Sequence, residues 1–532
     1  MTRPAATAAD DQVQVTAFLS DPASYPASPR SVTMMETHGA KVFLAGDEAW
    51  KIKRRVQFPY MDFSTLEKRR AACEREIEIN RIWAPELYLG CVPVTREVDG
   101  RLLIGGSGEP VEWAVRMRRF AQSDLVGAVA DKGAITPEFA GRLADMVFDS
   151  HVKAAPAEST NGAERVAQLV ASVSRNLAGV AAILTPELPK TFCERAEARL
   201  ARAAPVLDQR ARRGLVRRCH GDLHLDNIVM WQGRPMLFDA IEFDEDLATI
   251  DTLYDLAFLL MDLDHRGLRG DANIVLNRYL WRSQETLDLD GLVALPLFLG
   301  LRAGVRALVA SERAEQELAK ETKAGSADRQ IARARGYMRT ALAYLDPPPA
   351  GFVAVGGLSG TGKSTLSAQL APDLGPGPGA VHLRSDLERK SLCGVGETDR
   401  LGPEGYAEAV TAQVYDTLFD KAHRVLTAGH GVIVDAVFAK PQERFRLAET
   451  GESAGVPLHG LWLTADPDTL MQRVDGRRND ASDATSDIVK MQLGYDIGPL
   501  SPAWTIIDAG RDMQKTTAEA KAALSGQMRE ES

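Results

Sequence analysis

The residues most clearly suited to chemistry lie in a glycine-rich stretch that follows Phe352. The segment Gly357-Leu-Ser-Gly-Thr-Gly-Lys-Ser364 fits the phosphate-binding P-loop pattern without a mismatch. Glycines let backbone N–H groups approach phosphate oxygens, and the helix expected from Lys363 adds its positive end. Lys363 would reach the β- and γ-phosphates, and the Ser364 hydroxyl would bind Mg²⁺. The other residues expected to bind the nucleotide are Gly357, Ser359, Gly360, Thr361, Gly362 and Thr365.

A second set of polar residues lies in the segment His220-Gly-Asp-Leu-His-Leu-Asp-Asn227, after which a turn leads to Asp239. The turn predicts a hairpin that returns Asp239 to the neighbourhood of Asp222, with Asn227 between them. Asp222 can orient an attacking hydroxyl and accept its proton, while Asn227 and Asp239 can hold Mg²⁺ through oxygen ligands. We interpret His220 as a structural residue that hydrogen-bonds the loop, and His224 has no assigned role.

Further upstream, two short strand patterns flank Gly46-Asp47 and predict a hairpin whose second strand carries Lys51 and Lys53 on one face. The capping box Ser64-x-x-Glu67 predicts that a helix follows. Glu76 lies beside the apolar face of this helix, where a carboxylate needs a partner, and a strand lysine is the obvious candidate. A solvated position in a charged helix is an equally good interpretation of Glu76.

The region after residue 351 alternates strand and helix patterns, which is typical of a parallel sheet built from βαβ units. In such sheets ligands bind beyond the carboxyl ends of the strands, so Asp386 should face the P-loop as a general base or else cap the next helix. Asp435 ends an apolar strand and is placed for Mg²⁺ or its water shell. The expected strands are 352–357, 380–384, 431–437, 458–464 and 504–508.

Three arginines, Arg473, Arg477 and Arg478, precede the segment Asn479 to Asp483. Arginines in this position can close over phosphates as a lid, with Arg473 contacting the nucleotide and the other two stabilising charge in the transition state. A solvated surface is the alternative for these arginines and for Asp386. A basic run from Arg210 to Arg218 is most simply a solvated face as well, with attraction of an anionic substrate as the alternative because the run directly precedes the segment that begins at His220.

The composition of the whole chain limits its class. A length of 532 residues predicts two or three domains. The net charge of −10 argues against a general nucleic-acid or anionic-membrane surface. The five cysteines include no C-x-x-C pair, so neither a zinc site nor a disulfide framework is indicated. We find no apolar run of membrane-spanning length and no signal-peptide core, which makes the cytoplasm the expected location.

The predicted organisation has two domains. Residues 1–30 are expected to be a flexible segment with a short helix near Asp11 to Ser20, and residues 31–345 form the first domain. Asp346-Pro-Pro-Pro349 breaks the preceding helix, so 346–350 is a Pro-rich linker. Residues 351–532 form the second domain.

The pattern His220-x-Asp222-x₄-Asn227, followed by Asp239 and by Asp-Thr-Leu-Tyr-Asp-Leu-Ala from residue 251, resembles aminoglycoside phosphotransferases and related kinase-like enzymes. The resemblance covers roughly residues 35–345 and implies a protein-kinase-like α+β fold. It also implies that Lys51 (or Lys53) binds nucleotide phosphates and that Glu76 pairs with this lysine. One departure is the lack of a clear glycine-rich loop between residues 37 and 45.

The second half resembles small P-loop kinases, the group of zeta toxins, gluconate kinase and polynucleotide kinases. The matching features are Gly357 to Thr365, Ser385-Asp386-x-x-Arg389, Asp435 and the segment Arg477 to Asp483. The resemblance implies a P-loop parallel α/β domain in which Asp386 is the general base and Arg389 contacts substrate. The whole chain looks like the bacterial proteins that fuse the two kinds of domain.

These patterns predict an ATP- and Mg²⁺-dependent phosphotransferase that acts on a hydroxyl group of a small molecule, with a P-loop site and a second kinase-like site. Two alternatives stay open. One is an ATP-gated regulatory or binding protein with slow hydrolysis, and the other is an RNA 5′-hydroxyl kinase, which the net charge of −10 disfavours. The sequence identifies neither the acceptor nor the oligomeric state.

Overall fold

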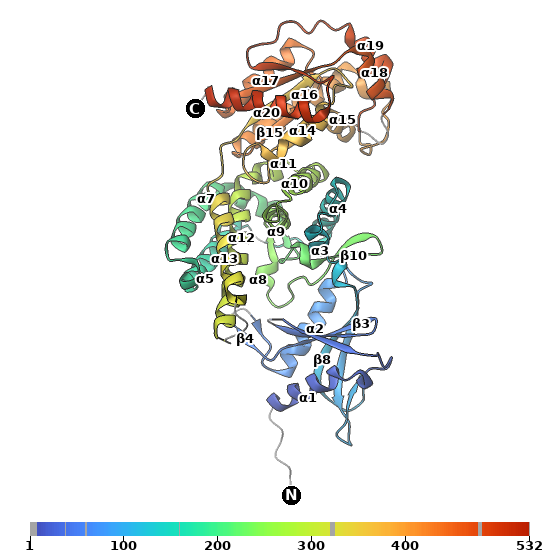
Figure 1. Ribbon diagram of the computed structural model, residues 1–532, viewed down its shortest axis with the longest axis vertical. Coiled ribbons are helices and arrows are strands. Elements are labelled where there is room, and N and C mark those ends of the chain that lie inside the picture. Colours follow the sequence, from blue (N-terminus) through green and yellow to red (C-terminus); the bar gives the residue numbers. More distant parts are fainter. Residues whose placement is uncertain are drawn as a thin grey trace. The chain divides into compact units, whose positions relative to one another are not determined.

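The computed structural model describes residues 8–37, 39–58, 61–158, 160–319, 325–476 and 481–530 (Figure 1). The chain forms two compact units that are interleaved in sequence. Unit 1 is Met1–Glu158 with Gly214–Leu259, and unit 2 is Ser159–Arg213 with Leu260–Ser532. Residues of the kinase-like resemblance therefore contribute to both units.

Unit 1 is built on an antiparallel sheet of order β1-β2-β3-β8-β6-β7. The expected hairpin is present, because β2 and β3 pair with Val42 opposite Lys51. Helix α2 (Leu66–Asn80) packs on the sheet through Cys73 and Ile77. The strands are β1 (Val32–Glu36), β2 (Ala40–Ala45), β3 (Glu48–Lys53), β6 (Tyr88–Arg96), β7 (Leu102–Ile104) and β8 (Glu109–Arg118).

The N-terminal cap of α2 differs from the expected capping box. Thr65, not Ser64, is the cap residue, and its side chain accepts a hydrogen bond from Lys68 N. The Ser64 hydroxyl instead donates to Asp62 at 2.6 Å. Adjacent Ser and Thr residues both suit an N-cap, and local sequence does not decide between them.

The short helix expected near Asp11 to Ser20 is present, and it packs on the sheet. Helix α1 (Ala8–Ser20) packs its Val15 and Leu19 into a core cluster with Phe43 and Ile52 of the sheet. The remaining elements of unit 1 are β4 (Gln57–Phe58), β5 (Met61–Asp62), α3 (Val126–Asp131), α4 (Pro137–Lys153), β9 (Val216–Arg218), β10 (Ile228–Trp231), β11 (Arg234–Leu237), α8 (Glu245–Ala248) and β12 (Thr249–Asp251). Helix α9 (Thr252–His265) continues from unit 1 into unit 2.

Unit 2 begins with a group of helices in which one expected surface cation is buried. Arg210 is fully buried, and its Nη1 donates to Asp288 at 2.8 Å and to Leu287 O at 2.7 Å, so the solvated-face interpretation is wrong for this residue. The helices are α5 (Gly162–Gly179), α6 (Ala181–Leu184), α7 (Glu187–Arg212), α10 (Arg269–Ser283), α11 (Thr286–Asp290), α12 (Leu295–Ala319) and α13 (Ser326–Leu345).

Among the described residues, the helical run Thr286–Ala319 is long and apolar enough to cross a membrane by length and composition. The expectation that no such run exists was therefore wrong. Every residue from Gly291 to Gly304 is buried, and 72% of the most apolar window of the run is buried inside the protein. A helix that is surrounded by other helices requires this composition.

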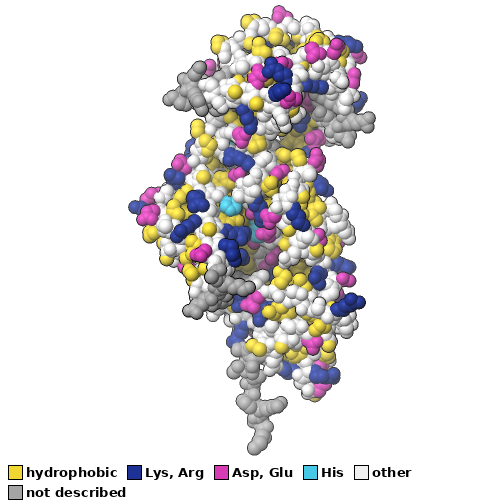
Figure 2. All heavy atoms as spheres, viewed as in Figure 1, with side chains coloured by type: hydrophobic (Ala, Val, Ile, Leu, Met, Phe, Trp, Pro, Cys, Tyr) yellow, Lys and Arg dark blue, Asp and Glu magenta, His cyan; other side chains and the backbone are white. Residues whose placement is uncertain are grey.

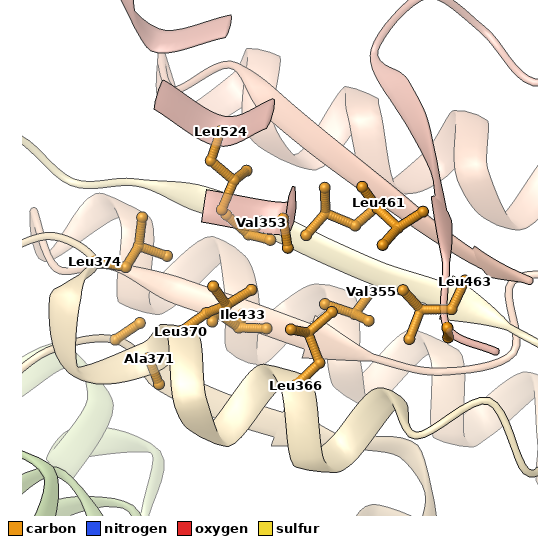
Figure 3. Close-up of a cluster of buried hydrophobic side chains, with 14 residues drawn as sticks. Val353, Val355, Leu366, Leu370, Ala371, Leu374, Ile433, Leu461, Leu463 and Leu524 are labelled. Atoms are coloured by element: carbon orange, nitrogen blue, oxygen red, sulfur yellow. The ribbon is translucent and has the colours of Figure 1, made fainter. Parts of the chain in front are cut away.

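The P-loop domain of unit 2 contains the predicted parallel sheet, in the order β14-β15-β13-β16-β17. Figure 3 shows Val353 and Val355 of the central strand packed between Leu461 and Leu463 of β16 and Leu366 and Leu370 of α14. The strands are β13 (Phe352–Gly357), β14 (Val381–Arg384), β15 (Val432–Asp435), β16 (Leu458–Thr464) and β17 (Trp504–Asp508). The helices are α14 (Lys363–Leu370), α15 (Ser385–Leu392), α16 (Glu408–Thr427), α17 (Pro441–Ala454), α18 (Pro467–Asp475), α19 (Ser486–Leu493) and α20 (Met513–Glu530).

The edge strand β14 is covered by helix α10. Asn277 accepts a hydrogen bond from His382 N at 2.6 Å, and the side-chain amides of Asn273 and Asn277 both donate to Ala380 O. Two side chains thus replace a neighbouring strand and protect an edge that would otherwise be open to pairing. This contact joins the helical part of unit 2 to the P-loop sheet.

Buried His430 gives the protein a predicted pH-dependent stability. Burial lowers the pKa of His430 from 6.5 to about 4, and its Nε2 bonds Gly379 O at 2.9 Å. In the unfolded chain this histidine gains a proton as the pH falls below 6.5, while the folded chain stays neutral to about 4. We expect stability to be complete above pH 6.5 and to fall by about 3 kcal/mol on going to pH 4 through this group.

The measurement is urea unfolding between pH 4 and 7.5. The pH dependence should be shallower in His430→Gln than in the wild type, whereas exposed His423→Gln should follow the wild type. Parallel curves for all three proteins would show that His430 is not the group responsible.

Candidate functional site

In unit 1 the predicted catalytic loop brings its polar residues together. Asn227 Nδ2 donates to Asp222 Oδ2 at 2.8 Å and to Asp222 O at 2.9 Å. His220 bonds Phe238 O at 2.9 Å through Nε2, which is the structural role expected for it. His224 Nε2 lies 3.4 Å from Asp222 Oδ2, so this histidine borders the site. The hairpin β10–β11 then returns Asp239, which has a φ of 60°.

A buried carboxylate that the site assignments missed holds this loop in place. Asp255 of α9 accepts hydrogen bonds from His220 N at 3.2 Å and from Gly221 N at 2.9 Å, and His151 Nε2 lies 3.1 Å away. Its side chain is fully buried. The sequence did contain an indication of this role, because Asp255 lies within the apolar run that follows Asp251. A carboxylate that is buried in such a run needs hydrogen-bond donors nearby.

Glu76 has the partner expected for it, and a second one. Its Oε1 lies 2.9 Å from Lys51 Nζ and its Oε2 lies 2.6 Å from Lys53 Nζ. Lys51 also pairs with Asp239 at 2.6 Å, and Lys53 also pairs with Glu242. Burial raises the pKa of Asp239, but the positive charges of Lys51 and Lys53 and the hydrogen bond from Lys51 outweigh this effect. The pKa of Asp239 therefore lies below its ordinary value. Both lysines remain charged, because burial is outweighed by these carboxylates and the pKa of each is raised.

This network predicts a large effect for Glu76→Ala. The variant leaves buried Lys53 (2% exposed) with one carboxylate in place of two, and breaking a buried pair in this way costs about 3 kcal/mol or more. Urea unfolding of unit 1 should show this loss. Glu78→Ala in the same helix is the matched control, because its side chain is 67% exposed and its loss should cost under about 0.5 kcal/mol. Equal effects of the two variants would contradict the structural role of Glu76.

In unit 2 the P-loop has the backbone that its glycines predict. Gly360 has a φ of 88°, and a Cβ atom there would lie 2.6 Å from Leu470 O. Helix α14 begins at Lys363, directly after Gly362. Lys363 Nζ donates to Leu358 O at 3.1 Å, and Thr361 Oγ1 donates to the same oxygen at 2.8 Å. Contacts within the loop itself thus hold its conformation.

The parallel sheet places the two predicted carboxylates at the strand ends beside the P-loop, because Asp435 lies opposite Val355 of β13 and opposite Arg384 of β14, two residues before Asp386. Burial and the charge of Asp435 raise the pKa of Asp386, and Lys363 and Arg384 oppose the shift. Burial acts against ionisation of Asp435 too, but His382, Lys363 and Arg384 outweigh it and lower the pKa. Asp386 lies in the first turn of α15, whose N-cap residue is Arg384, so Asp386 is not the helix cap.

His382 is a residue that the sequence reasoning missed. Its Nε2 lies 3.5 Å from Asp435 Oδ2, and burial lowers its pKa. Asp435 therefore keeps a charge beside a neutral imidazole. His382 also lines a cavity of about 220 Å³ between α10, α11 and the β14–α15 connection, together with Trp281, Arg384 and Leu387. A hollow of this size next to the strand end can hold a small molecule.

Arg389, predicted to contact substrate, is buried within α15. Its Nη1 donates to Gly405 O at 2.8 Å and to Thr411 Oγ1 at 3.1 Å, and its guanidinium lies 4.9 Å from the Tyr406 ring centroid. The adjacent Lys390 pairs with Asp483 at 2.9 Å, and Tyr406 donates to the same carboxylate. These contacts hold the segment around Tyr406 against α15, and the sequence did not predict them.

The three predicted lid arginines are only partly described. Arg473 lies in α18, and its Nη1 is buried without a hydrogen-bond partner among the described residues. Arg477 and Arg478 lie outside the described residues. The donor set at the P-loop suits a nucleotide and Mg²⁺: amides and Lys363 for phosphates, and the Ser364 hydroxyl and Asp435 as hard oxygen ligands.

Comparison with known proteins places the chain in a family. It is similar to uncharacterized proteins of Mycobacterium bovis and of two strains of Mycobacterium tuberculosis, with 30% identity over 468 residues, which cover 86% of this chain and 88% of each relative. The chain belongs to the family of these proteins.

Two domain profiles match this family member. The phosphotransferase enzyme family matches residues 60–290, and an AAA domain matches residues 352–495. These matches confirm the predicted fusion of a kinase-like phosphotransferase domain with a P-loop domain, and they support phosphotransferase activity.

Solved structures with a similar chain path exist for both halves. A gluconokinase from Sinorhizobium meliloti is 19% identical, with a TM-score of 0.26, over 33% of this chain and 93% of its own. A choline/ethanolamine kinase family protein from Mesorhizobium loti is 15% identical, with a TM-score of 0.35, over 63% of this chain and 99% of its own. At such low sequence identities and TM-scores, these structures support no conclusion about the function of this chain.

Proposed function

We propose that this family member is an ATP- and Mg²⁺-dependent phosphotransferase that acts on a hydroxyl group of a small molecule, with its main catalytic site at the P-loop. The observation that carries the proposal is the placement of two carboxylates at the strand ends beside the P-loop: Asp435 lies opposite Val355 of β13 and opposite Arg384 of β14, which is two residues before Asp386. A phosphate-binding cation, a base and a metal ligand are the minimum that hydroxyl phosphorylation requires.

In the proposed reaction Asp386 orients the acceptor hydroxyl and takes its proton. The hydroxyl oxygen forms a bond to phosphorus while the bond to the ADP oxygen breaks. Asp435 and the Ser364 hydroxyl would hold Mg²⁺, which supplies charge neutralisation when bound. Arg389 and the cavity beside His382 favour a small acceptor. On the face drawn in Figure 2, the coloured acidic and basic side chains are interspersed, which disfavours a nucleic-acid acceptor.

The kinase-like site of unit 1 supports a second activity within the same proposal. Asp222 would be its base, and Asn227 and Asp239 its metal ligands, while Lys51, held by Glu76, would bind phosphates. Lys51 Nζ lies 2.6 Å from Asp239 Oδ1, so phosphate and metal binding would compete with this ion pair.

The test is a transfer assay with purified full-length protein, Mg²⁺ and ATP labelled in the γ-phosphate, screened against a pool of metabolites. We expect a labelled product that depends on an acceptor and is lost in Lys363→Ala. A product lost in Asp222→Asn and kept in Lys363→Ala would assign the transfer to unit 1. Slow ADP release without acceptor dependence would favour an ATP-gated regulator, and labelling of a 5′-hydroxyl oligonucleotide would favour an RNA kinase.

A further inference from the structure

A glutamine from outside the P-loop is attached directly to it. Gln492 of α19 is 8% exposed, and its Oε1 accepts a hydrogen bond from Ser359 N at 2.7 Å. A backbone N–H can only donate, so the amide orientation is fixed with Oε1 toward the loop. Nε2 is then the remaining polar atom of the side chain, and it donates no hydrogen bond to the described residues.

The position of Gln492 is held by packing on both sides of the contact. Val489, one turn earlier on α19, is fully buried in a cluster with Leu470 and Val474 of α18, and Leu358 of the P-loop packs against this cluster. The same loop residue, Leu358, receives the Lys363 Nζ hydrogen bond through its carbonyl oxygen. Gln492, Lys363 and the loop amides are thus arranged around one short stretch of backbone.

We propose that Gln492 is a nucleotide-binding residue: Ser359 N–H holds its Oε1, and its Nε2 donates a hydrogen bond to an oxygen of the terminal phosphate. The inference rests on the proposed function, because it requires a nucleoside triphosphate at the P-loop. A donor that meets only the terminal phosphate favours ATP over ADP. In the alternative hypothesis, the Gln492 amide occupies the Ser359 N–H and is displaced when nucleotide binds, so that it competes with the nucleotide. This hypothesis predicts that removing the amide strengthens ATP binding.

The experiment compares two variants in the full-length protein with an Asp239→Asn background, which weakens nucleotide binding in unit 1. Gln492→Glu keeps an acceptor for Ser359 N–H but replaces the Nε2 donor by an anionic oxygen. Gln492→Met has a similar shape and neither group. The matched control is Gln413→Glu, an exposed glutamine in the middle of α16.

The dissociation constants of Mg-ATP and Mg-ADP are measured by titration calorimetry, with thermal unfolding as the check on folding. Loss of a hydrogen bond to a charged group should weaken ATP binding by about tenfold or more in both Gln492 variants. ADP binding should stay within about twofold, and Gln413→Glu should match the background protein.

Equal weakening of ATP and ADP would overturn the inference and leave Gln492 as a support of the loop. Tighter ATP binding in Gln492→Met would overturn it in favour of the alternative hypothesis. Unchanged ATP and ADP constants in both variants would overturn it as well. Failure of the wild-type protein to bind either nucleotide at the P-loop would overturn the proposed function itself, which makes the two failures distinguishable.

Discussion

Replacing Lys363 by alanine is expected to weaken Mg-ATP binding at the P-loop by about 100-fold or more. The lysine is the only P-loop side chain that carries a full positive charge, and charge-assisted bonds to phosphate are the strongest polar contacts available there. Its loss also removes the charge that opposes the negative charges of Asp386 and Asp435. Two carboxylates would then repel the incoming triphosphate.

Titration calorimetry with the full-length protein measures this effect as a loss of one binding site. Lys190→Ala is the matched control, because the Lys190 side chain is 79% exposed on α7 and should leave both stoichiometry and affinity unchanged. Wild-type binding by the Lys363→Ala protein would show that the loop does not bind the nucleotide. Thermal unfolding separates this result from a folding defect.

Asp386→Asn is expected to lower acceptor-dependent turnover by about 10² or more, which is the usual effect of removing a general base. Asparagine keeps the shape of the side chain but is a poor base. Asp386 is not the cap of α15, so the variant loses only the interaction of a carboxylate with the first helical turn, about 0.5 kcal/mol. Melting temperature and ATP affinity should therefore stay close to those of the wild type.

The chain offers a closely matched control for this variant. Asp487 follows a serine at the start of α19 just as Asp386 follows Ser385 at the start of α15, but its side chain is 90% exposed. Asp487→Asn should retain full turnover. If Asp386→Asn keeps near-normal turnover with a saturating acceptor, the base lies elsewhere in the site.

Local sequence was sufficient where the chemistry depends on neighbouring residues. The P-loop was predictable because its conformation is set by glycines with positive φ, such as Gly360, and by the helix that follows within a few residues. The Asn227–Asp222 contact spans five residues and was predictable for the same reason. The strands of the P-loop domain were predictable from continuous apolar runs, which buried parallel strands require.

Other contacts join residues that are distant in sequence, and the sequence left them open. A surface position was an equally good interpretation of Glu76, because no residue close to it in the sequence indicates that Lys53 Nζ lies 2.6 Å from its carboxylate. Arg210 was interpreted as solvent-exposed because its ion-pair partner, Asp288, is 78 residues further along the chain.

The sequence by itself therefore determined the kind of chemistry at the P-loop, since phosphate binding is a property of a short backbone segment and one lysine. Only the tertiary structure decided which further groups surround that segment. His382 meets Asp435 because β14 and β15 are neighbours in the sheet, and Gln492 meets Ser359 across 133 residues because α19 packs beside the loop. Strand order and helix packing depend on burial summed over the whole domain, and no local pattern encodes that sum.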